Sequence, residues 1–237
     1  MSGGIRERVD ALAWERLAAD LDARGAATTP PLLTAAECAS LVALYGDRAR
    51  FRSRVDMAPR GYGDGDYQYF ARPLPPLVEA LREALYPRLA ATANRWAAAL
   101  GAAERYPDDL AAFLAHCHAS GQERPTPLLL HYRAGGYNCL HQDLYGAVAF
   151  PLQVVFLLSR PGSDFTGGEV LLVEQRPRAQ SAGAAYTLEQ GAALVFTTRY
   201  RPVRGSRRSY RVNVRHGVSP VHTGERYTLG IIFHDAA

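Results

Sequence analysis

Residues 210–235 read YRVNVRHGVSPVHTGERYTLGIIFHD. Two runs within this stretch, YRVNVRHGV and RYTLGIIFH, are rich in the β-branched and aromatic residues that favour strands, and a Ser-Pro pair lies between them. His216 closes the first run, and Arg226 opens the second run ten residues later. The stretch therefore predicts two neighbouring strands, one carrying a histidine and the other an arginine.

The same pattern continues back along the chain as far as Gly121. PLLLHYR, PLQVVFLLS, EVLLVEQ and AALVFTTR are further short runs of strand-forming residues, separated by glycine, proline and serine. Strands do not alternate with helices here, so a Rossmann sheet is not expected. Six or more short strands at this spacing predict a sandwich or barrel of the jelly-roll kind.

The N-terminal half has helical signals instead. Helices are predicted over residues 5–24, from 35 onwards, over 76–100 and over 107–120. Thr34 and Glu37 have the spacing of a capping box, and Pro87 is expected to kink or split the third helix. Residues 51–75 are rich in glycine and tyrosine and predict a loop with short strands.

We predict a single α+β domain over residues 1–237, because no linker-like stretch separates the halves. Residues 1–124 are expected to form a mainly helical support and lid region. Residues 125–237 are expected to form the β-rich core that carries the functional site.

Composition excludes several function classes. All 27 basic residues are arginine, which excludes Schiff-base lysine chemistry and the Walker A phosphate loop. The net charge of +4 permits an anionic partner without requiring one. Three widely spaced cysteines, a charged N-terminus and the absence of a long apolar run predict a soluble cytoplasmic protein with free thiols and no membrane partner. The oligomeric state is not predicted.

The segment NCLHQDLYG, residues 138–146, contains a candidate metal site. His141 and Asp143 are two residues apart, and on an extended chain this spacing places both side chains on one side. Two histidines and one carboxylate on one face are the ligand set of non-haem Fe(II) oxygenases. His216 is the preferred second histidine because it closes a strand, whereas His222 and His234 are better explained as turn and strand residues.

Arg226 has a use next to such a metal site. A buried arginine can hold a distal carboxylate of a cosubstrate through paired hydrogen bonds while the metal binds the other end. Taken alone, His141 is better explained as a polar residue at a strand end. The combination of His-x-Asp, a strand-terminal histidine and an arginine ten residues later is much more specific.

In these motifs the sequence resembles the 2-oxoglutarate and Fe(II)-dependent dioxygenases. It resembles most the bacterial group whose family name refers to oxidative processing of damaged DNA. The similar stretches cover nearly the whole chain and include GYGDGDYQYF, YNCLHQDLYG, DFTGGEVLLVEQRPR and YRVNVRHGVS. The resemblance implies a double-stranded β-helix of the cupin type, with the site inside its mouth.

The resemblance also implies the cofactors and their ligands. His141, Asp143 and His216 would bind Fe(II), and Arg226 would hold the far carboxylate of 2-oxoglutarate. Tyr132, nine residues before His141, would donate a hydrogen bond to 2-oxoglutarate or, alternatively, fill the core. The implied reaction is that of an oxidoreductase, which uses O2 to hydroxylate a C–H bond and releases succinate and CO2.

The substrate remains open between two classes. Oxidative demethylation of damaged, single-stranded nucleic acid fits the family resemblance. The ten-residue spacing between His216 and Arg226 resembles prolyl hydroxylases more than alkylated-base demethylases, and this favours a protein side chain or small metabolite. A non-catalytic jelly-roll binding module is a third hypothesis, which failure to bind Fe(II) would favour.

Candidate substrate contacts come from two segments. Seven arginines lie within residues 199–215, and Arg204, Arg207 and Arg208 among them are candidate phosphate contacts. Part of this basic stretch is expected to rim the site, although a solvated hairpin is the plainer explanation. Tyr67, in the segment 61–70, is a candidate contact on a substrate-covering loop, with an inert surface loop as the alternative.

Overall fold

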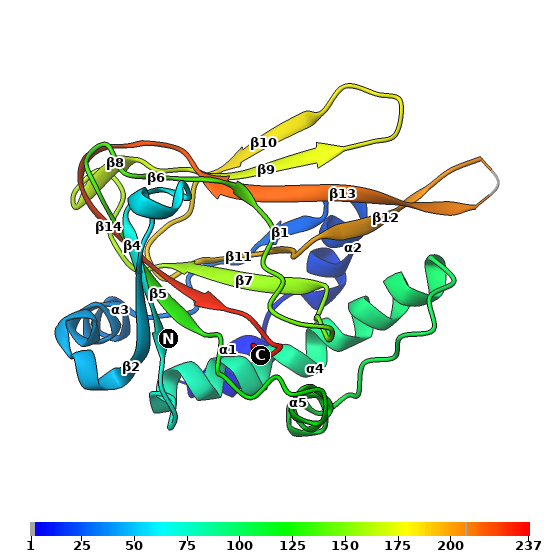
Figure 1. The fold of residues 1–237 in the computed structure, drawn as a ribbon, viewed down its shortest axis with the longest axis horizontal. Helices are drawn as coiled ribbons and strands as arrows, with labels where there is room; N and C mark the ends of the chain where they lie inside the picture. Colours follow the sequence, from blue (N-terminus) through cyan, green and yellow to red (C-terminus); the bar gives the residue numbers. More distant parts are fainter. Residues whose placement is uncertain (1–2, 207) are drawn as a thin grey trace.

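The structure is a computed structural model that describes residues 3–206 and 208–237. Two antiparallel sheets lie one above the other, and helices cover the lower face of the larger sheet in Figure 1. The helices are α1 (Ile5–Asp10), α2 (Trp14–Arg24), α3 (Ala35–Ala43), α4 (Pro76–Ala99) and α5 (Leu110–Ala119). None of the helices in the described chain is long and apolar enough to cross a membrane.

The larger sheet has the strand order β1-β11-β7-β14-β5-β4-β2, with β8 paired to β14. These strands are β1 (Ala26–Thr28), β2 (Phe51–Asp56), β4 (Asp66–Phe70), β5 (Leu128–Arg133), β7 (Leu152–Leu157), β8 (Phe165–Gly167), β11 (Ala193–Thr197) and β14 (Val221–Ile231). The run that contains Arg226 forms β14, and the run PLLLHYR forms β5. These two strands are neighbours at the centre of the sheet.

The smaller sheet has the order β10-β9-β13-β6-β3, with β12 paired to β13. Its strands are β3 (Gly63–Asp64), β6 (Tyr137–His141), β9 (Val170–Gln175), β10 (Ala182–Tyr186), β12 (Tyr200–Arg204) and β13 (Ser209–Val218). The hairpins β9–β10 and β12–β13 extend beyond the body on the right of Figure 1.

Side chains along the central strands of the larger sheet point alternately to its two faces. One face packs against the helices, and the other packs against the smaller sheet. On β7, Val154 and Phe156 pack with the helices, whereas Leu157 packs with the residues between the two sheets. On β11, Val195 joins the helical core and Phe196 the core between the sheets. Because successive strand residues face opposite sides, one sequence can cover both surfaces of a buried sheet.

The structure tests the predictions for the first two helical segments. The capping box is confirmed, since Thr34 accepts a hydrogen bond from the Glu37 backbone and Glu37 accepts one from the Thr34 backbone. The single helix expected over 5–24 is wrong, because α1 ends at Asp10 and α2 begins at Trp14. The Trp14 indole donates to the Val9 carbonyl at 2.8 Å, and this bond spans the turn between the two helices.

The helix is not split at Pro87, since α4 continues through it as one helix of 24 residues. An internal proline costs a helix about 3 kcal/mol. Twelve residues of α4 are buried, and this packing outweighs the lost hydrogen bond. The sequence patterns also gave no signal for β1 and β10, whose short alanine-rich stretches each contain a single strand-forming residue.

A buried ion pair joins α4 to the end of the chain. Arg82 and Asp235 are 2% and 0% exposed, and Nη2 of Arg82 lies 2.8 Å from Asp235 Oδ1. Arg72 and His118 also contact Oδ2 of Asp235, at 2.6 and 3.0 Å. The Asp235 carboxylate is therefore shared by two arginines and a histidine beneath the larger sheet.

We expect Asp235→Asn to lower the free energy of unfolding by about 3–5 kcal/mol, because it leaves Arg82 as a buried charge without its counterion. The control is Asp10→Asn, which removes an exposed pair with Arg88 and should cost about 1 kcal/mol or less. Urea unfolding followed by circular dichroism measures both. Equal losses for the two variants would contradict the assignment.

Candidate active site

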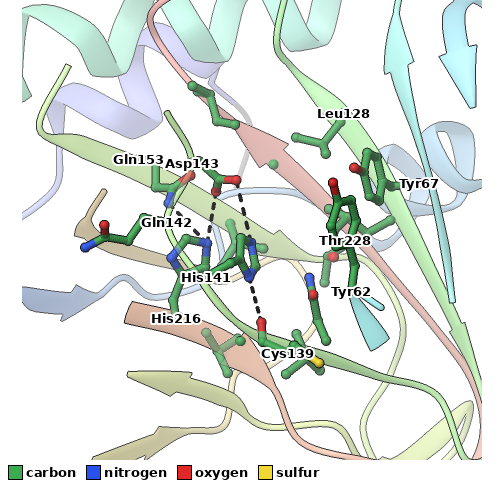
Figure 2. Close-up of a pocket in the computed structure, with 18 of the residues that line it drawn as sticks. Tyr62, Tyr67, Leu128, Cys139, His141, Gln142, Asp143, Gln153, His216 and Thr228 are labelled. Atoms are coloured by element: carbon green, nitrogen blue, oxygen red, sulfur yellow. Dashed lines mark hydrogen bonds and ion pairs between the residues drawn. The ribbon is translucent and has the colours of Figure 1, made fainter. Parts of the chain in front are cut away.

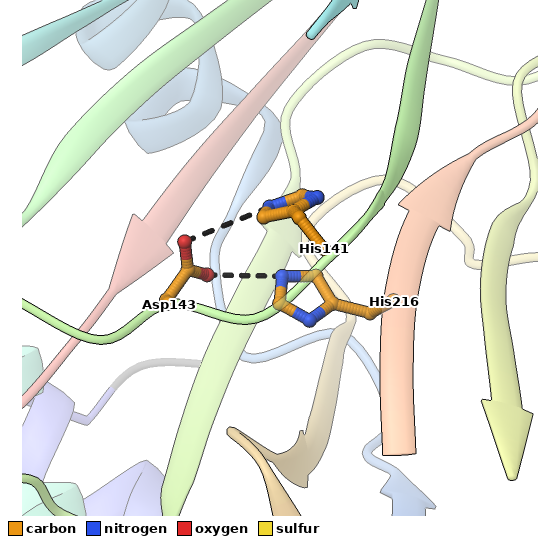
Figure 3. A group of neighbouring side chains, drawn as sticks. All are labelled: His141, Asp143 and His216. Carbon is orange, nitrogen blue, oxygen red and sulfur yellow. Dashed lines mark hydrogen bonds and ion pairs between the residues drawn. The ribbon is translucent and has the colours of Figure 1, made fainter. Parts of the chain in front are cut away.

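The two histidines of the predicted metal site face one another across adjacent strands. His141 ends β6, and β13 places His216 directly opposite it in antiparallel register. Directly opposed residues point to the same face of a sheet, so both imidazoles enter the space between the two sheets. Asp143 follows in the segment after β6 and completes the group (Figure 3).

The three side chains have the geometry of a metal site. Their potential ligand atoms lie within 4.8 Å of one another, and no other such group of histidine, cysteine or acidic side chains occurs in residues 3–206 and 208–237. Nε2 of His216 lies 2.9 Å from Asp143 Oδ2, and Nε2 of His141 lies 3.6 Å from Oδ1. A metal held by these three side chains would have protein ligands on one side only and open positions on the other. Non-haem Fe(II) oxygenases require such an arrangement.

Hydrogen bonds and the local electrostatics keep His141 and Asp143 in their metal-binding forms. The Cys139 carbonyl lies 2.7 Å from His141 Nδ1 and can only accept, so Nδ1 carries the proton and Nε2 keeps its lone pair. Burial and the nearby His216 lower the pKa of His141. Burial alone would raise the pKa of Asp143, but His216, His141 and a Tyr145 hydrogen bond hold it well below its usual range. Neutral imidazole beside an ionised carboxylate fits a divalent cation.

Arg226 supplies a buried positive charge near the metal group. It is 2% exposed, and its Nε and Nη1 have no hydrogen-bond partner in the described protein. Burial lowers the pKa of Arg226 to about 10, an effect that Tyr132 and Glu169 oppose. A buried guanidinium without hydrogen-bonding partners is costly, so these atoms fit an anionic ligand that would satisfy them.

A cavity of about 430 Å³ connects the metal group to Arg226. Tyr132 lies in its wall, directly opposite Arg226 in the register of β5 and β14, and its hydroxyl accepts from Asn138 Nδ2 at 3.3 Å. Tyr67 also lines this cavity, across from the histidines in Figure 2. Gly168 is required here, because a Cβ on it would lie 2.7 Å from the Arg226 Cδ.

The candidate arginines lie outside the cavity. Arg204 and Arg208 are exposed near the end of the β12–β13 hairpin, and neither lines the cavity, while Arg207 lies outside the described residues. Alternation along β13 buries His216 and exposes Arg211 and Arg215, so these two arginines lie on the opposite face. None of these described arginines is among the residues that line the cavity.

Sequence reasoning missed two polar residues that contact the site. Tyr145 donates to Asp143 Oδ1 at 2.6 Å, and Gln153 Nε2 lies 3.4 Å from His216 Nε2. Tyr145 is two residues beyond Asp143, so the His-x-Asp-x-Tyr spacing was a signal for it. Gln153 had a weaker signal, as the polar residue in the apolar run PLQVVFLLS.

Solved structures with a similar fold are iron oxygenases and related enzymes. A prolyl-4-hydroxylase of Pseudomonas putida superposes with a TM-score of 0.55 at 16% identity, covering 94% of this chain and 99% of its own. A 2-oxoglutarate–Fe(II) oxygenase family protein of Burkholderia pseudomallei gives 0.52 at 18% identity, covering 100% and 95%. The epimerase SnoN of nogalamycin biosynthesis gives 0.56 at 18% identity, covering 93% and 81%.

Sequence comparison finds nearer relatives. Uncharacterized proteins from two strains of Mycobacterium tuberculosis, Rv2227 and MT2286, are each 56% identical over 168 residues, which is 71% of this chain and 72% of theirs. Residues 65–236 match a family described as "Oxygenase, catalysing oxidative methylation of damaged DNA". The site residues fit Fe(II) and 2-oxoglutarate, and the name of the Burkholderia pseudomallei protein that shares the fold includes both. The chain itself belongs to the oxygenase family that matches residues 65–236.

Proposed function

We propose that the protein is an Fe(II)- and 2-oxoglutarate-dependent dioxygenase that hydroxylates a C–H bond and forms succinate and CO2. The observation that carries the proposal is the presence of the His141–Asp143–His216 group and the unpartnered Arg226 in one cavity. We further propose that the two sheets form a double-stranded β-helix with this cavity at its mouth.

Each residue has a defined task in this proposal. His141, Asp143 and His216 would hold the iron, and three protein ligands would leave positions for the cosubstrate and O2. Bound iron, together with 2-oxoglutarate and O2, supplies the oxidising power for C–H hydroxylation. A bound substrate that covers the mouth of the cavity would keep bulk water away from the reacting groups.

Arg226 and Tyr132 orient the cosubstrate. The guanidinium of Arg226 would pair with the far carboxylate of 2-oxoglutarate, which would satisfy its Nε and Nη1 donors, atoms that have no partner among the described residues. The Tyr132 hydroxyl is fully buried, and burial raises its pKa to about 12, so it remains protonated and available as a donor. The positive charge and this donor favour a dicarboxylate over a neutral ligand.

For the substrate we propose single-stranded nucleic acid that carries a methylated base. The supporting observation is an exposed basic surface on the smaller sheet, with no acidic residue in the sequence between Glu189 and Glu225. Its members are the exposed residues Arg199, Arg204, Arg208, Arg211 and Arg215. Tyr200 lies among them with the Arg211 guanidinium carbon 4.6 Å from its ring centroid. Phosphates and bases are the groups that such a surface binds.

A protein side chain is the second candidate substrate. The fold similarity to the Pseudomonas putida prolyl-4-hydroxylase favours it, as does the ten-residue spacing from His216 to Arg226. Tyr62, Leu140 and Leu144 are large apolar side chains exposed near the site, and they would suit a peptide as well as a base. The alternative of a non-catalytic binding module predicts no turnover of 2-oxoglutarate at all.

We expect His216→Ala to weaken binding of Fe(II), or of Co(II) as its stand-in, by more than about 100-fold, beyond the usual effect of losing an outer hydrogen-bond partner. His222→Ala is the matched control, because His222 is exposed and lies outside the ligand group. Anaerobic titration calorimetry without 2-oxoglutarate measures both. Full retention of affinity in His216→Ala would remove the metal assignment.

Turnover separates the candidate substrates. Succinate is measured with 2-oxoglutarate alone, with methylated single-stranded DNA and with a pool of proline-rich peptides. We expect DNA to stimulate succinate formation and to release formaldehyde, and His216→Ala to abolish both. Stimulation by the peptides alone would support the second candidate, and no succinate in any reaction would contradict the dioxygenase proposal.

The basic surface predicts a salt dependence. Replacing Arg204, Arg208 and Arg211 singly by alanine should each lower the slope of log affinity against log salt by about 0.7 for single-stranded DNA, if each contacts one phosphate. Arg88→Ala on α4 is the control, since Arg88 is exposed and pairs with Asp10. Fluorescence anisotropy with catalytically inactive His216→Ala protein gives the slopes. Unchanged slopes in all three variants would rule out this surface.

A further inference from the structure

The metal ligand Asp143 lies outside the regular strands. β6 ends at His141 and β7 begins at Leu152, so residues 142–151 have no sheet ladder to place them. The histidines are fixed by their paired strands, whereas Asp143 depends on contacts made by its neighbours. A metal ligand has to be held to within a fraction of an ångström, so this segment requires anchors of its own.

Gln142 is the first anchor. Its side chain turns away from the ligand group in Figure 2, and Nε2 donates to the Val214 carbonyl at 2.8 Å and the Arg199 carbonyl at 3.0 Å. Val214 precedes His216 by two residues on β13. Gln142 therefore ties the segment that contains Asp143 to β13, the strand that supplies His216.

Tyr145 is the second anchor, and it contacts the carboxylate itself. Its hydroxyl donates to Asp143 Oδ1 at 2.6 Å and accepts from the Tyr69 hydroxyl at 2.9 Å. Tyr69 is 8% exposed and belongs to β4 of the larger sheet. The Tyr145 carbonyl also accepts from the backbone of Ala237 at 3.0 Å. A chain of hydrogen bonds thus links the carboxylate to the sheet opposite the histidines.

We propose that Tyr145 and Gln142 are positioning residues for the metal ligand Asp143. Tyr145 donates to Oδ1 and would leave Oδ2, which lies 2.9 Å from His216 Nε2, free to bind the metal. A carboxylate that offers one oxygen occupies one coordination position and keeps the others open for the cosubstrate and O2. The inference rests on the proposed metal site, and it gives a task to Gln142 and Tyr145, the two polar residues of HQDLY that are not proposed ligands.

A purely structural role for Tyr145 makes a different prediction. Its ring lies 6.0 Å from that of Tyr69 and 5.9 Å from that of His234, so it could serve only to fill space. Phenylalanine would preserve those ring contacts and remove the hydroxyl. Tyr145→Phe therefore separates the hydrogen bond from the packing.

The test is anaerobic calorimetry of Co(II) binding to the full chain, with the visible Co(II) spectrum and the melting temperature of the metal-free protein recorded in parallel. We expect Tyr145→Phe to bind Co(II) about 10–100-fold more weakly, as for other outer partners of metal ligands. Its Co(II) spectrum should also differ from that of wild type, because the carboxylate is free to offer both oxygens.

Tyr106→Phe is the matched control. The Tyr106 hydroxyl donates to the Ala149 carbonyl at 3.3 Å, so it contacts the same segment without touching Asp143. We expect this variant to keep the wild-type affinity and spectrum. Equal losses in Tyr106→Phe and Tyr145→Phe would overturn the proposal in favour of general loosening of the segment.

Gln142→Met gives a second, independent variant should Tyr145→Phe not fold. It removes both bonds to the Val214 and Arg199 carbonyls, and weaker Co(II) binding with an unchanged melting temperature supports the proposal. Wild-type affinity and spectrum in a folded Tyr145→Phe, or in Gln142→Met, overturn the role of that residue. Failure of the wild-type protein to bind Co(II) is a different result, which contradicts the metal site itself.

Discussion

The pairing register of β6 with β13 is the constraint on which the candidate site depends. It sets His216 opposite His141, with both imidazoles between the sheets. Successive strand residues face opposite sides, so a slip of one residue would turn His216 outward and bring an arginine into the cavity. Val212 and Val214, both buried on the same face as His216, make that slip costly because it would expose them.

A second register completes the site from the other sheet. Arg226 on β14 lies opposite Tyr132 on β5, so the groups that would hold the cosubstrate come from the larger sheet and the histidines from the smaller one. The site therefore exists only when the two sheets pack together. The core between the sheets includes Leu157, Leu172 and Phe196. Because this close packing sets the distance between the sheets, a change that loosens the core would also change the geometry of the cavity.

Sequence patterns predicted the parts of this arrangement that depend on short-range spacing. His141 and Asp143 were visible as a pair, and His216 and Arg226 each lay in a strand-forming run, so the ligand group could be named before its geometry was known. Interactions over long separations in the chain left no such signal. The Tyr69–Tyr145 hydrogen bond joins residues 76 positions apart, and the break before Trp14 depends on packing rather than on helix propensity.

The direction of the β12–β13 hairpin bears on substrate size. A strand rises about 3.3 Å per residue, so Ser209 at the start of β13 lies roughly 23 Å along the strand from His216. The exposed Arg211 and Arg215 lie along that distance and on the face away from the cavity. A small metabolite bound at the metal could not reach them. If this surface contributes to substrate binding, the substrate is a chain long enough to cross the edge of the smaller sheet, and its repeated negative charges, rather than the reacting group, are what the arginines bind.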